Sequence, residues 1–339
     1  MSGGVDSSVV AGLLHEAGHE VIGVTLQLYD HGQAAGRKGA CCAGQDIHDA
    51  RNVADRLGIA HYVIDSEQAF RRNVIQAFAD SYAAGQTPVP CVACNQHLKF
   101  GDLLGLARDL GAQALATGHY VRRETGAEGA ELHRAIDDAR DQSWFLFATT
   151  RAQLEFARFP LGEMPSKAAV RAEAARMGLP VADKPDSQDI CFVPSGSYAD
   201  IVARLRPDAA EPGDIVDAQG QVLDRHQGIG RYTVGQAKRL GAARGQVVTR
   251  IDAPNRRIEV GPRHAGGQRV LLRDCNWLIA PPDQKLRAMV KLRARETPHP
   301  ALIDFATGSV TLEQPALAAP GQACVVYDGT RVLGGGFIQ

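Results

Sequence analysis

The sequence predicts an α/β domain with a parallel sheet, followed by a small β-rich domain and a C-terminal β-barrel. Three observations support this. A Gly/Ser-rich loop at residues 2–8 runs into a helical pattern. Helix-like and strand-like segments then alternate to about residue 205, as in parallel sheets with crossover helices. Beyond Pro207, short runs punctuated by Gly, Pro and Asn replace the helical periodicity. We therefore expect domains at 1–205, 206–265 and 266–339.

The composition is that of a soluble globular protein. A length of 339 residues suits two or three domains, and 45% apolar with 22% charged residues is ordinary. No run approaches the roughly 20 apolar residues that span a bilayer, and no signal peptide precedes the loop. We expect a cytoplasmic protein with no membrane partner. Seven cysteines, an odd number, fit a reducing compartment, and a net charge of −1 means that nucleic-acid binding would need local patches.

The first domain is expected to alternate helices and strands in a regular order. Because ligands bind at the carboxyl ends of parallel strands, the glycine loop, Leu26 near the end of its strand, and Gly118 with His119 should converge. The expected helices are 9–15, 46–57, 67–84 and 96–110, the expected strands are 19–28, 61–64 and 112–117, and 86–95 is expected to be a Pro-punctuated loop.

The loop Ser-Gly-Gly-Val-Asp-Ser-Ser at 2–8 has the features of an anion site. Gly3 and Gly4 lack a Cβ, so the backbone can approach a ligand closely. Serine hydroxyls and the N–H groups at a helix start favour a phosphate. No Gly-Lys-Ser/Thr follows, which excludes a Walker A loop, and the glycine spacing differs from the dinucleotide fingerprint. The alternative is a turn that only caps a helix.

A second informative set comprises Cys91-x-x-Cys94 and Cys191. A lone CxxC fits half a zinc site, a redox pair or cluster ligands. No second CxxC completes a four-cysteine zinc site, and a thioredoxin-like motif would follow the first strand of a small domain. Cys191, in a loop expected to enter a short strand, could face the same crevice. The alternative is that these cysteines are small core residues.

The loop resembles the pyrophosphate loop of PP-loop ATP pyrophosphatases, and the chain as a whole resembles bacterial tRNA-specific 2-thiouridylases. The resemblance implies a PP-loop (adenine nucleotide alpha hydrolase-like) domain before the two β-rich domains. In that family a short apolar strand precedes the loop, whereas here only Met1 does. We expect a misassigned start, the alternative being a sheet without its first strand. The matching segments are SGGVDSS, TPVPCVACNQHLKF, ATGHYVR, DARDQSWFL, KPDSQDICFV, QGIGRYTVGQ, APGQACVVY and LGGGFI.

The resemblance implies replacement of the 2-oxygen of the wobble uridine (position 34) of tRNA by sulfur, with ATP and Mg²⁺. Cys94 is then the nucleophile and Cys191 carries a persulfide, which leaves a disulfide between them. The sulfur would come from a cysteine desulfurase or a relay carrier. We expect Lys99, His119 or the helix near Asn95 to lower a thiol pKa. The implied ATP site is Met1, Ser2, Gly3, Gly4, Val5, Asp6, Ser7, Ser8, Leu26 and Gly118, with Asp6 as candidate Mg²⁺ ligand.

The chain departs from the family at one position. Many relatives carry Asp three residues before the nucleophile, where this chain has Cys91. Acid/base work would then fall to water, the thiol or His119. Alternatively Cys91, Cys94 and Cys191 hold a [4Fe–4S] cluster. Two competing functions are a PP-loop adenylating ligase such as an amidotransferase, and a non-catalytic RNA-binding protein.

The resemblance also implies residues that face tRNA. The stretch from Arg225 to Arg273 contains eleven Lys and Arg residues, and we set against them only two acidic residues, Asp252 and Glu259. This excess of positive charge predicts a phosphate-contacting surface. The target uridine must be flipped out, because its C2 is inaccessible in a stacked loop. The implied tRNA-contacting residues are His119, Arg140, Asp141, Gln142, Arg293, Arg295 and Gln322.

Overall fold

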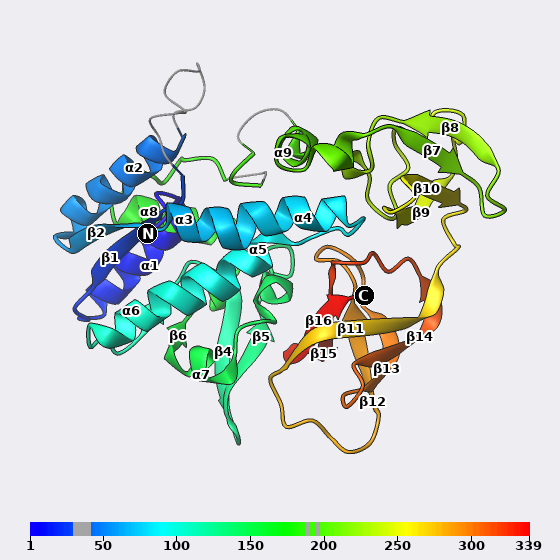
Figure 1. Ribbon diagram of the computed structural model, residues 1–339. Helices are drawn as coiled ribbons and strands as arrows, with labels where there is room; N and C mark the ends of the chain where they lie inside the picture. The colour runs from blue at the N-terminus through cyan, green and yellow to red at the C-terminus, as the bar shows by residue number, and fades with distance from the viewer. Residues whose placement is uncertain (30–41, 187–189, 194–196) are drawn as a thin grey trace. The chain divides into compact units, whose positions relative to one another are not determined.

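A computed structural model describes residues 1–29, 42–186, 190–193 and 197–339 (Figure 1). The chain forms two compact units, each described separately below. The first comprises Met1–Asn73, Cys94–Pro194 and Thr330–Val332, and the second Val74–Ala93, Ser195–Gly329 and Leu333–Gln339. This division differs from the three domains expected above, whose boundaries stay a prediction. Among the described residues, no helix is both long and apolar enough to cross a membrane.

The first unit begins with the predicted βα arrangement. Helix α1 (Val5–Glu16) leads to strand β1 (Ile22–Gln27), and helix α2 (Cys42–Leu57) connects it to strand β2 (Ala60–Asp65). The two strands are parallel, with Ile22 opposite Ala60 and Gln27 opposite Asp65. One face of α1, including Val9 and Val10, packs in an apolar cluster with residues of α2 and α8. The α/β class with parallel strands is therefore confirmed.

A second parallel pair is shorter than the sequence indicates. Strand β3 (Leu115–Ala116) pairs with β6 (Ala157–Arg158), so only two residues of the expected strand at 112–117 are β structure. This pair is separate from the β1–β2 sheet among the described residues. On β1, the Met1 amino nitrogen donates to the carbonyl oxygen of Val24.

The helix that carries the CxxC motif starts earlier than expected. α5 (Pro90–Ala93), π-helical η2 (Cys94–Leu103) and α6 (Leu104–Asp109) follow one another directly. Proline suits the first helical position because it lacks an N–H that would otherwise be unpaired. The loop expected over 86–95 therefore ends before Pro90, and both cysteines lie on helix. The long helix expected at 67–84 is present as α3 (Glu67–Phe70), η1 (Arg71–Gln76) and α4 (Ala77–Ala83).

The rest of the first unit contains a hairpin that no sequence pattern indicated. Charged residues lie next to one another in its first strand, as Arg122, Arg123 and Glu124, so the alternation typical of a half-buried strand is absent there. The hairpin meets β16 at a single pair, His133 with Arg331. The elements are β4 (Val121–Gly126), β5 (Gly129–Arg134), η3 (Ser143–Leu146), α7 (Arg151–Phe156), η4 (Pro160–Glu163) and α8 (Lys167–Arg176).

The second unit contains the two β-rich regions that the sequence predicts. A four-stranded sheet has the order β8-β7-β10-β9, with β7 and β10 parallel. Beyond it, six strands close into the expected barrel in the order β11-β14-β13-β12-β15-β16, because β11 also pairs with β16. The barrel is yellow to red in Figure 1. Its apolar interior includes Val290, Ile303 and Val326.

The bounds of these elements are as follows. Short helices α9 (Tyr198–Leu205), η5 (Pro207–Ala210) and η6 (Ile229–Arg231) accompany β7 (Gly213–Val216), β8 (Val222–His226), β9 (Val247–Asp252) and β10 (Arg257–Gly261). The barrel consists of β11 (Gly267–Trp277), β12 (Leu286–Lys291), β13 (His299–Asp304), β14 (Ser309–Ala316), β15 (Ala323–Asp328) and β16 (Arg331–Ile338).

Candidate active site around the glycine loop

The glycine loop is shaped by close packing against α2. Gly3 has φ +69, and a Cβ there would lie 2.2 Å from the carbonyl oxygen of Asp46, so only glycine fits. Gly4 is the extended N-cap residue of α1 (φ −94, ψ 167), and no side chain caps the helix. The first N–H groups of a helix have no intrahelical partner. The loop therefore leaves the positive end of α1 available to an anion.

The serines of the loop bind mainly to the loop itself. Ser7 Oγ accepts a hydrogen bond from the backbone N–H of Ser2 at 3.0 Å and lies 3.2 Å from Ser2 Oγ. Ser8 Oγ donates to the Gly4 carbonyl oxygen at 2.8 Å, and the Ser8 side chain is fully buried. Of the three hydroxyls predicted for the ATP site, that of Ser8 thus stabilises the loop from inside. Ser2 is exposed.

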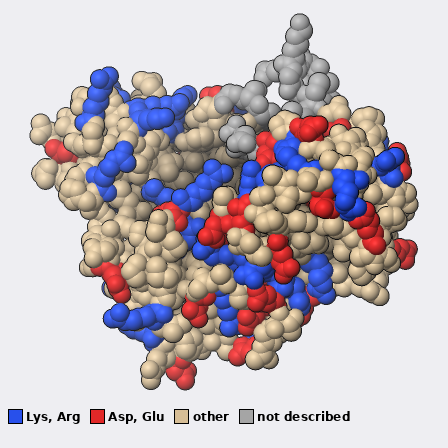
Figure 2. Space-filling model, turned by 180° about the vertical axis from the view of Figure 1, so that it is seen from behind, with Lys and Arg blue, Asp and Glu red and all other residues tan. Residues whose placement is uncertain are grey.

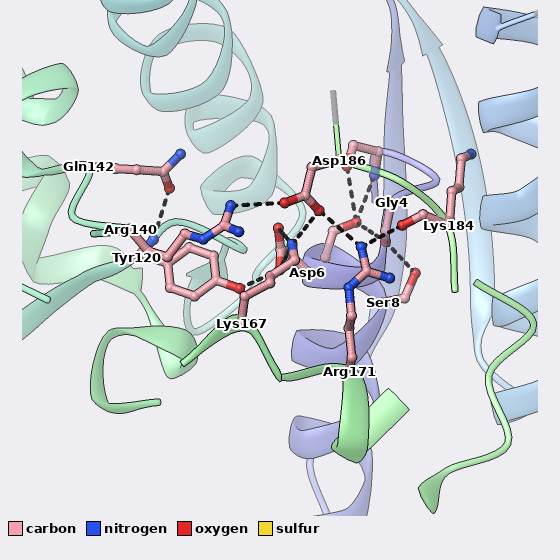
Figure 3. Close-up of polar contacts among 12 residues, drawn as sticks. Gly4, Asp6, Ser8, Tyr120, Arg140, Gln142, Lys167, Arg171, Lys184 and Asp186 are labelled. Carbon is pink, nitrogen blue, oxygen red and sulfur yellow. Dashed lines mark hydrogen bonds and ion pairs between the residues drawn. The ribbon is translucent and has the colours of Figure 1, made fainter. Parts of the chain in front are cut away.

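Asp6 lies in a network of ion pairs at the start of α1 (Figure 3). Its carboxylate accepts hydrogen bonds from the Tyr120 hydroxyl at 2.6 Å and from Lys167 Nζ at 2.8 Å. Lys167 Nζ is also 2.8 Å from an oxygen of Asp186. A carboxylate oxygen beside a phosphate loop can serve as a ligand of Mg²⁺ together with phosphate oxygens. Asp6 is therefore the residue of this loop that could hold Mg²⁺.

The strand end predicted to meet the loop does so. A Cβ at Gly118 would lie 2.9 Å from the backbone nitrogen of Ser7, so the two segments are in direct contact. Leu26 lies on β1 opposite Ile64. His119 Nδ1 is 2.8 Å from Thr117 Oγ1, and burial, with Lys99 nearby, holds the pKa of His119 well below its usual value. His119 is therefore neutral at pH 7 and can hydrogen-bond without contributing a positive charge.

Cys94 and Cys191 share electrostatic neighbours. Cys94 is buried on η2, whereas Cys191 is exposed, and no strand follows it at 190–193. The Tyr29 hydroxyl donates to the Cys191 carbonyl oxygen at 3.1 Å. Burial raises the pKa of Tyr29, and both thiols raise it further, so Tyr29 lies within range of each. Both cysteines of the first unit therefore act on the pKa of the same tyrosine.

The surroundings of Cys191 shift the pKa of its thiol in opposite directions. Neighbouring groups desolvate its thiol and raise its pKa above the ordinary value of 9.0, while a hydrogen bond from Tyr29 and the charge of Lys99 lower it. Lys99 also lowers the pKa of His119. The predicted influence of Lys99 on a thiol is thus present at Cys191, although desolvation outweighs it.

The cysteines do not fit the cluster alternative in this arrangement. Cys91, Cys94 and Cys191 all belong to the described part of the chain, where no three His, Cys, Asp or Glu side chains could hold a metal ion together. A [4Fe–4S] cluster needs several sulfur ligands around one site. We derive no step through such a cluster. Cys41, in the adjacent Cys41-Cys42 pair, lies outside the described residues.

Asp141 and Gln142, which are predicted to contact tRNA, make hydrogen bonds within the first unit. The Asp141 side chain is only 3% exposed, and its oxygens accept hydrogen bonds from the backbone of Ala135 and from both the backbone and hydroxyl of Ser143. Gln142 Oε1 accepts from the Tyr120 N–H at 2.9 Å. Buried carboxylates with this many donors fix local backbone. Arg140 is more exposed, and it pairs with Asp186 at 2.8 Å.

The remaining predicted tRNA contacts lie in the second unit. Arg295 is exposed, Arg293 Nη2 donates to the Val234 carbonyl oxygen at 3.3 Å, and Gln322 Nε2 donates to that of Thr87 at 3.1 Å. On the face in Figure 2, Lys and Arg are mixed with Asp and Glu over part of the surface and lie apart from them elsewhere. Several basic residues of the 225–273 stretch are paired, for example Arg250 with Glu259 at 2.9 Å. The phosphate-contacting surface stays a prediction.

Sequence reasoning missed the side chains that organise the loop. Lys184 Nζ donates to the Gly3 carbonyl oxygen at 2.9 Å and pairs with Asp46 and Asp49 of α2. Lys184 and Asp186 stand just before Cys191, which is the one signal that pointed to them. Lys167 follows an N-cap serine in an otherwise ordinary helix, so nothing in the sequence marked it.

Comparison with known proteins agrees with this geometry. Family models match residues 1–195 (tRNA methyl transferase HUP domain), 200–262 (tRNA methyl transferase PRC-barrel domain) and 268–338 (aminomethyltransferase beta-barrel domain). A solved NMN synthetase from Francisella tularensis covers 61% of this chain and 74% of its own at 19% identity, with a TM-score of 0.34, which is too low for any argument.

Curated relatives match over the whole chain. The tRNA-specific 2-thiouridylase MnmA of Acidiphilium cryptum is 80% identical, covering 100% of this chain and 98% of its own length. Proteins with the same name from Gluconobacter oxydans (64% identical, 97% of its length) and Rhodospirillum centenum (57%, 90%) also cover all of this chain. The chain belongs to the tRNA-specific 2-thiouridylase family.

Proposed function

We propose that this protein is an ATP-dependent tRNA-uridine 2-sulfurtransferase that thiolates C2 of the wobble uridine at position 34. The observation that carries the proposal is the convergence within one unit. Gly118 touches the glycine loop, His119 follows it, and Lys99 acts on both His119 and Cys191. A phosphate loop and two cysteines that share neighbours suit a reaction that first activates an oxygen and then replaces it with sulfur.

The first half of the reaction makes the 2-oxygen a leaving group. An amide-like carbonyl oxygen leaves poorly, so it is joined to the α-phosphorus of ATP and pyrophosphate departs. The N–H groups at the start of α1 stabilise the departing anion, because they are fixed donors near the positive helix end. Mg²⁺, when bound, neutralises phosphate charge, and Asp6 would hold it. Lys167, displaced from Asp6, keeps its contact with Asp186.

The second half transfers sulfur from a persulfide on Cys191. Its terminal sulfur attacks C2, and AMP leaves with the former 2-oxygen. The Cys94 thiolate then attacks the inner sulfur, which releases the 2-thiouridine and joins Cys94 to Cys191 in a disulfide. A dithiol reductant supplies two electrons to restore the thiols. A donor of persulfide sulfur, such as a cysteine desulfurase or a relay carrier, reloads Cys191, which is exposed and so accessible to a partner.

The neutral state of His119 suits a role beside these steps. Because its pKa is well below the usual value, it is uncharged beside Lys99 and can accept a hydrogen bond there. Water, the thiol and His119 are the candidates for the acid/base work at the position where many relatives carry Asp and this chain carries Cys91. We further propose that tRNA contacts Arg140, Arg293, Arg295 and Gln322, and that the enzyme works in the cytoplasm.

The test is mass spectrometry of tRNA nucleosides after incubation with ATP, Mg²⁺, cysteine and a cysteine desulfurase. The wild-type protein should form 2-thiouridine, while Cys94→Ser and Cys191→Ser should form none and keep their affinity for tRNA. Cys275→Ser is the matched control, since Cys275 is also exposed but lies on β11. Retained thiolation in either of the first two variants removes that cysteine from the mechanism.

Two further measurements separate the competing functions. ATP turnover to AMP with and without tRNA distinguishes an enzyme from an RNA-binding protein, which would show none. Ammonia incorporation in place of sulfur would indicate an amidotransferase. Iron and acid-labile sulfide in protein purified without oxygen would revive the cluster, whereas a colourless and fully active preparation excludes it.

A further inference from the structure

The proposed sulfur transfer uses only one cysteine of the Cys91-x-x-Cys94 motif. Cys94 and Cys191 end each turnover joined in a disulfide, and Cys91 takes no part in forming it. A CxxC motif at the start of a helix can also act as a redox pair. The placement of Cys91 therefore bears on what its thiol does after sulfur transfer.

Cys91 and Cys94 lie one helical turn apart. The helical segments Pro90–Ala93 and Cys94–Leu103 follow one another without a break. Residues three apart on a helix lie on the same face with Cβ atoms about 5–6 Å apart, whereas a disulfide needs about 3.8 Å between them. A local shift of about 2 Å is therefore enough to join the two sulfurs. Both cysteines are thiols in the structure.

The two thiols of the motif differ in exposure. Cys91 is exposed, while Cys94 is only 9% exposed. A reductant in solution therefore has poor access to the sulfur of Cys94. Cys91 lies on the same helix, so its exchange with that sulfur is intramolecular and proceeds at an effective concentration far above that of a thiol in solution. Among the cysteines that the structure describes, Cys91 is the one that shares a helix with Cys94.

The chain that leads into this helix is held within the second unit. The Thr87 N–H donates to the Pro320 carbonyl oxygen at 2.7 Å, and Gln322 Nε2 donates to the Thr87 carbonyl oxygen at 3.1 Å. Pro90 then fixes φ at the first position of the helix. The backbone of Cys91 is thus ordered in advance, so little further conformational entropy is lost when its sulfur reacts.

We propose that Cys91 is a catalytic residue that resolves the disulfide left by sulfur transfer. The inference rests on the proposed function, which supplies the bond between Cys94 and Cys191. The Cys91 thiolate attacks the sulfur of Cys94, so that a bond forms between Cys91 and Cys94 while the bond from Cys94 to Cys191 breaks. Cys191 leaves with the electron pair of that bond and takes up the proton that Cys91 lost. The exchange moves the disulfide without net oxidation or reduction.

The exchange returns Cys191 to the thiol form before any reductant acts. Desolvation holds the pKa of Cys191 above its ordinary value of 9.0, so the released sulfur takes up a proton at pH 7. Because Cys191 is exposed, the sulfur donor can load it again. The dithiol reductant then acts on the bond between Cys91 and Cys94, where the sulfur of Cys91 is accessible, and supplies the two electrons that each turnover consumes.

The test maps the disulfides after one turnover without added reductant. The full chain, loaded with persulfide on Cys191, is mixed with ATP, Mg²⁺ and tRNA, quenched at intervals, alkylated with N-ethylmaleimide and analysed by peptide mass spectrometry. The disulfide between Cys94 and Cys191 should appear first and be replaced by one between Cys91 and Cys94, with Cys191 recovered as an alkylated thiol. In Cys91→Ser this replacement should be lost. Each disulfide is counted per 2-thiouridine formed, so a slower reaction in the variant does not alter the result.

Two further variants show whether the effect is specific to the motif. Cys275→Ser removes an exposed cysteine of β11 and should give the wild-type map. Cys191→Ser cannot carry the persulfide, yet mild oxidation with diamide should still join Cys91 to Cys94 in it. Failure of this pair to close would overturn the geometry on which the proposal stands. A sample without ATP gives the oxidation that occurs without sulfur transfer, which is subtracted.

The outcomes distinguish failure of the exchange from failure of the proposed function. A wild-type map in which Cys94 stays joined to Cys191 and Cys91 stays a thiol overturns the exchange and leaves sulfur transfer intact. If 2-thiouridine forms but Cys94 enters no disulfide, the disulfide step of the proposed function is wrong, and the exchange with it. If the wild type forms no 2-thiouridine, the proposed function fails, and the exchange, which needs its product, fails too.

Discussion

The Tyr29 hydroxyl lies 3.1 Å from the carbonyl oxygen of Cys191 and donates a hydrogen bond to it across 162 residues of chain. The Tyr29 ring packs edge-on against Phe70 at 5.7 Å, and Phe70 packs in the same way against Phe192 at 5.8 Å. The residue next to Cys191 is therefore held by an apolar contact, while Cys191 itself is held by a polar one. The position of the thiol depends on both.

Tyr29→Phe removes only the polar contact. The ring and its packing on Phe70 remain, so the unfolding temperature should stay within a few degrees of the wild type. A net hydrogen bond contributes about 1 kcal/mol, so thiolation should fall by roughly fivefold, while the tRNA-dependent release of pyrophosphate from ATP, which precedes sulfur transfer, is unchanged. Single-turnover thiolation with persulfide-loaded enzyme measures this. Equal loss in both reactions would instead indicate a general defect.

The second prediction concerns pH. Desolvation raises the pKa of Cys191 above 9.0, and Lys99 opposes that rise. The thiolate fraction in the protein without ligands should therefore be small at pH 7, and the alkylation rate should still climb beyond pH 9. Lys99→Gln removes the opposing positive charge, so the titration should move to yet higher pH. Lys285→Gln, at an exposed lysine 3.8 Å from Asp304 of the barrel, is the control. A downward shift in Lys99→Gln would contradict the assignment.

How far the sequence predicts this site depends on the kind of signal. The glycine loop, the strand end at Gly118 and the two cysteines are each marked by residue types with few other uses, and the structure brings these residues into one unit. Lys167 and Tyr29 are common residue types. Lys167 contacts Asp6, 161 positions away, and Tyr29 contacts the Cys191 carbonyl oxygen, 162 positions away. No local pattern encodes such partners. The Pro90 helix start could have been anticipated, since proline is favoured at the first helical position.

Asp141, for which the resemblance implies a contact with tRNA, has partners within the first unit that predict a role in stability as well. Its carboxylate is almost completely buried and holds two backbone N–H groups, a hydroxyl and Arg134. Asp141→Ala should therefore cost about 3 kcal/mol of unfolding free energy, because it leaves two backbone N–H groups and a hydroxyl without their acceptor. Asp138→Ala, at a 75% exposed partner of the same arginine, should cost less than about 1 kcal/mol. Urea denaturation measures both. A stable Asp141→Ala with weakened tRNA binding would restore its role as a direct contact.

Adjacent glycines of the loop should respond oppositely to alanine. At Gly3, φ is +69 and a Cβ would lie 2.2 Å from the Asp46 carbonyl oxygen. The left-handed conformation alone costs about 1–2 kcal/mol for a residue with a Cβ, and the loop must also shift from α2. At Gly4, φ is −94 and the nearest atom to a Cβ is Ser2 Oγ at 3.7 Å. Gly4→Ala should therefore keep or slightly raise the unfolding free energy, whereas Gly3→Ala should lower it and abolish AMP formation. Thermal unfolding and AMP release, measured side by side, test this pair. Equal stability of the two variants would mean that the Gly3 backbone is not held against α2 as described.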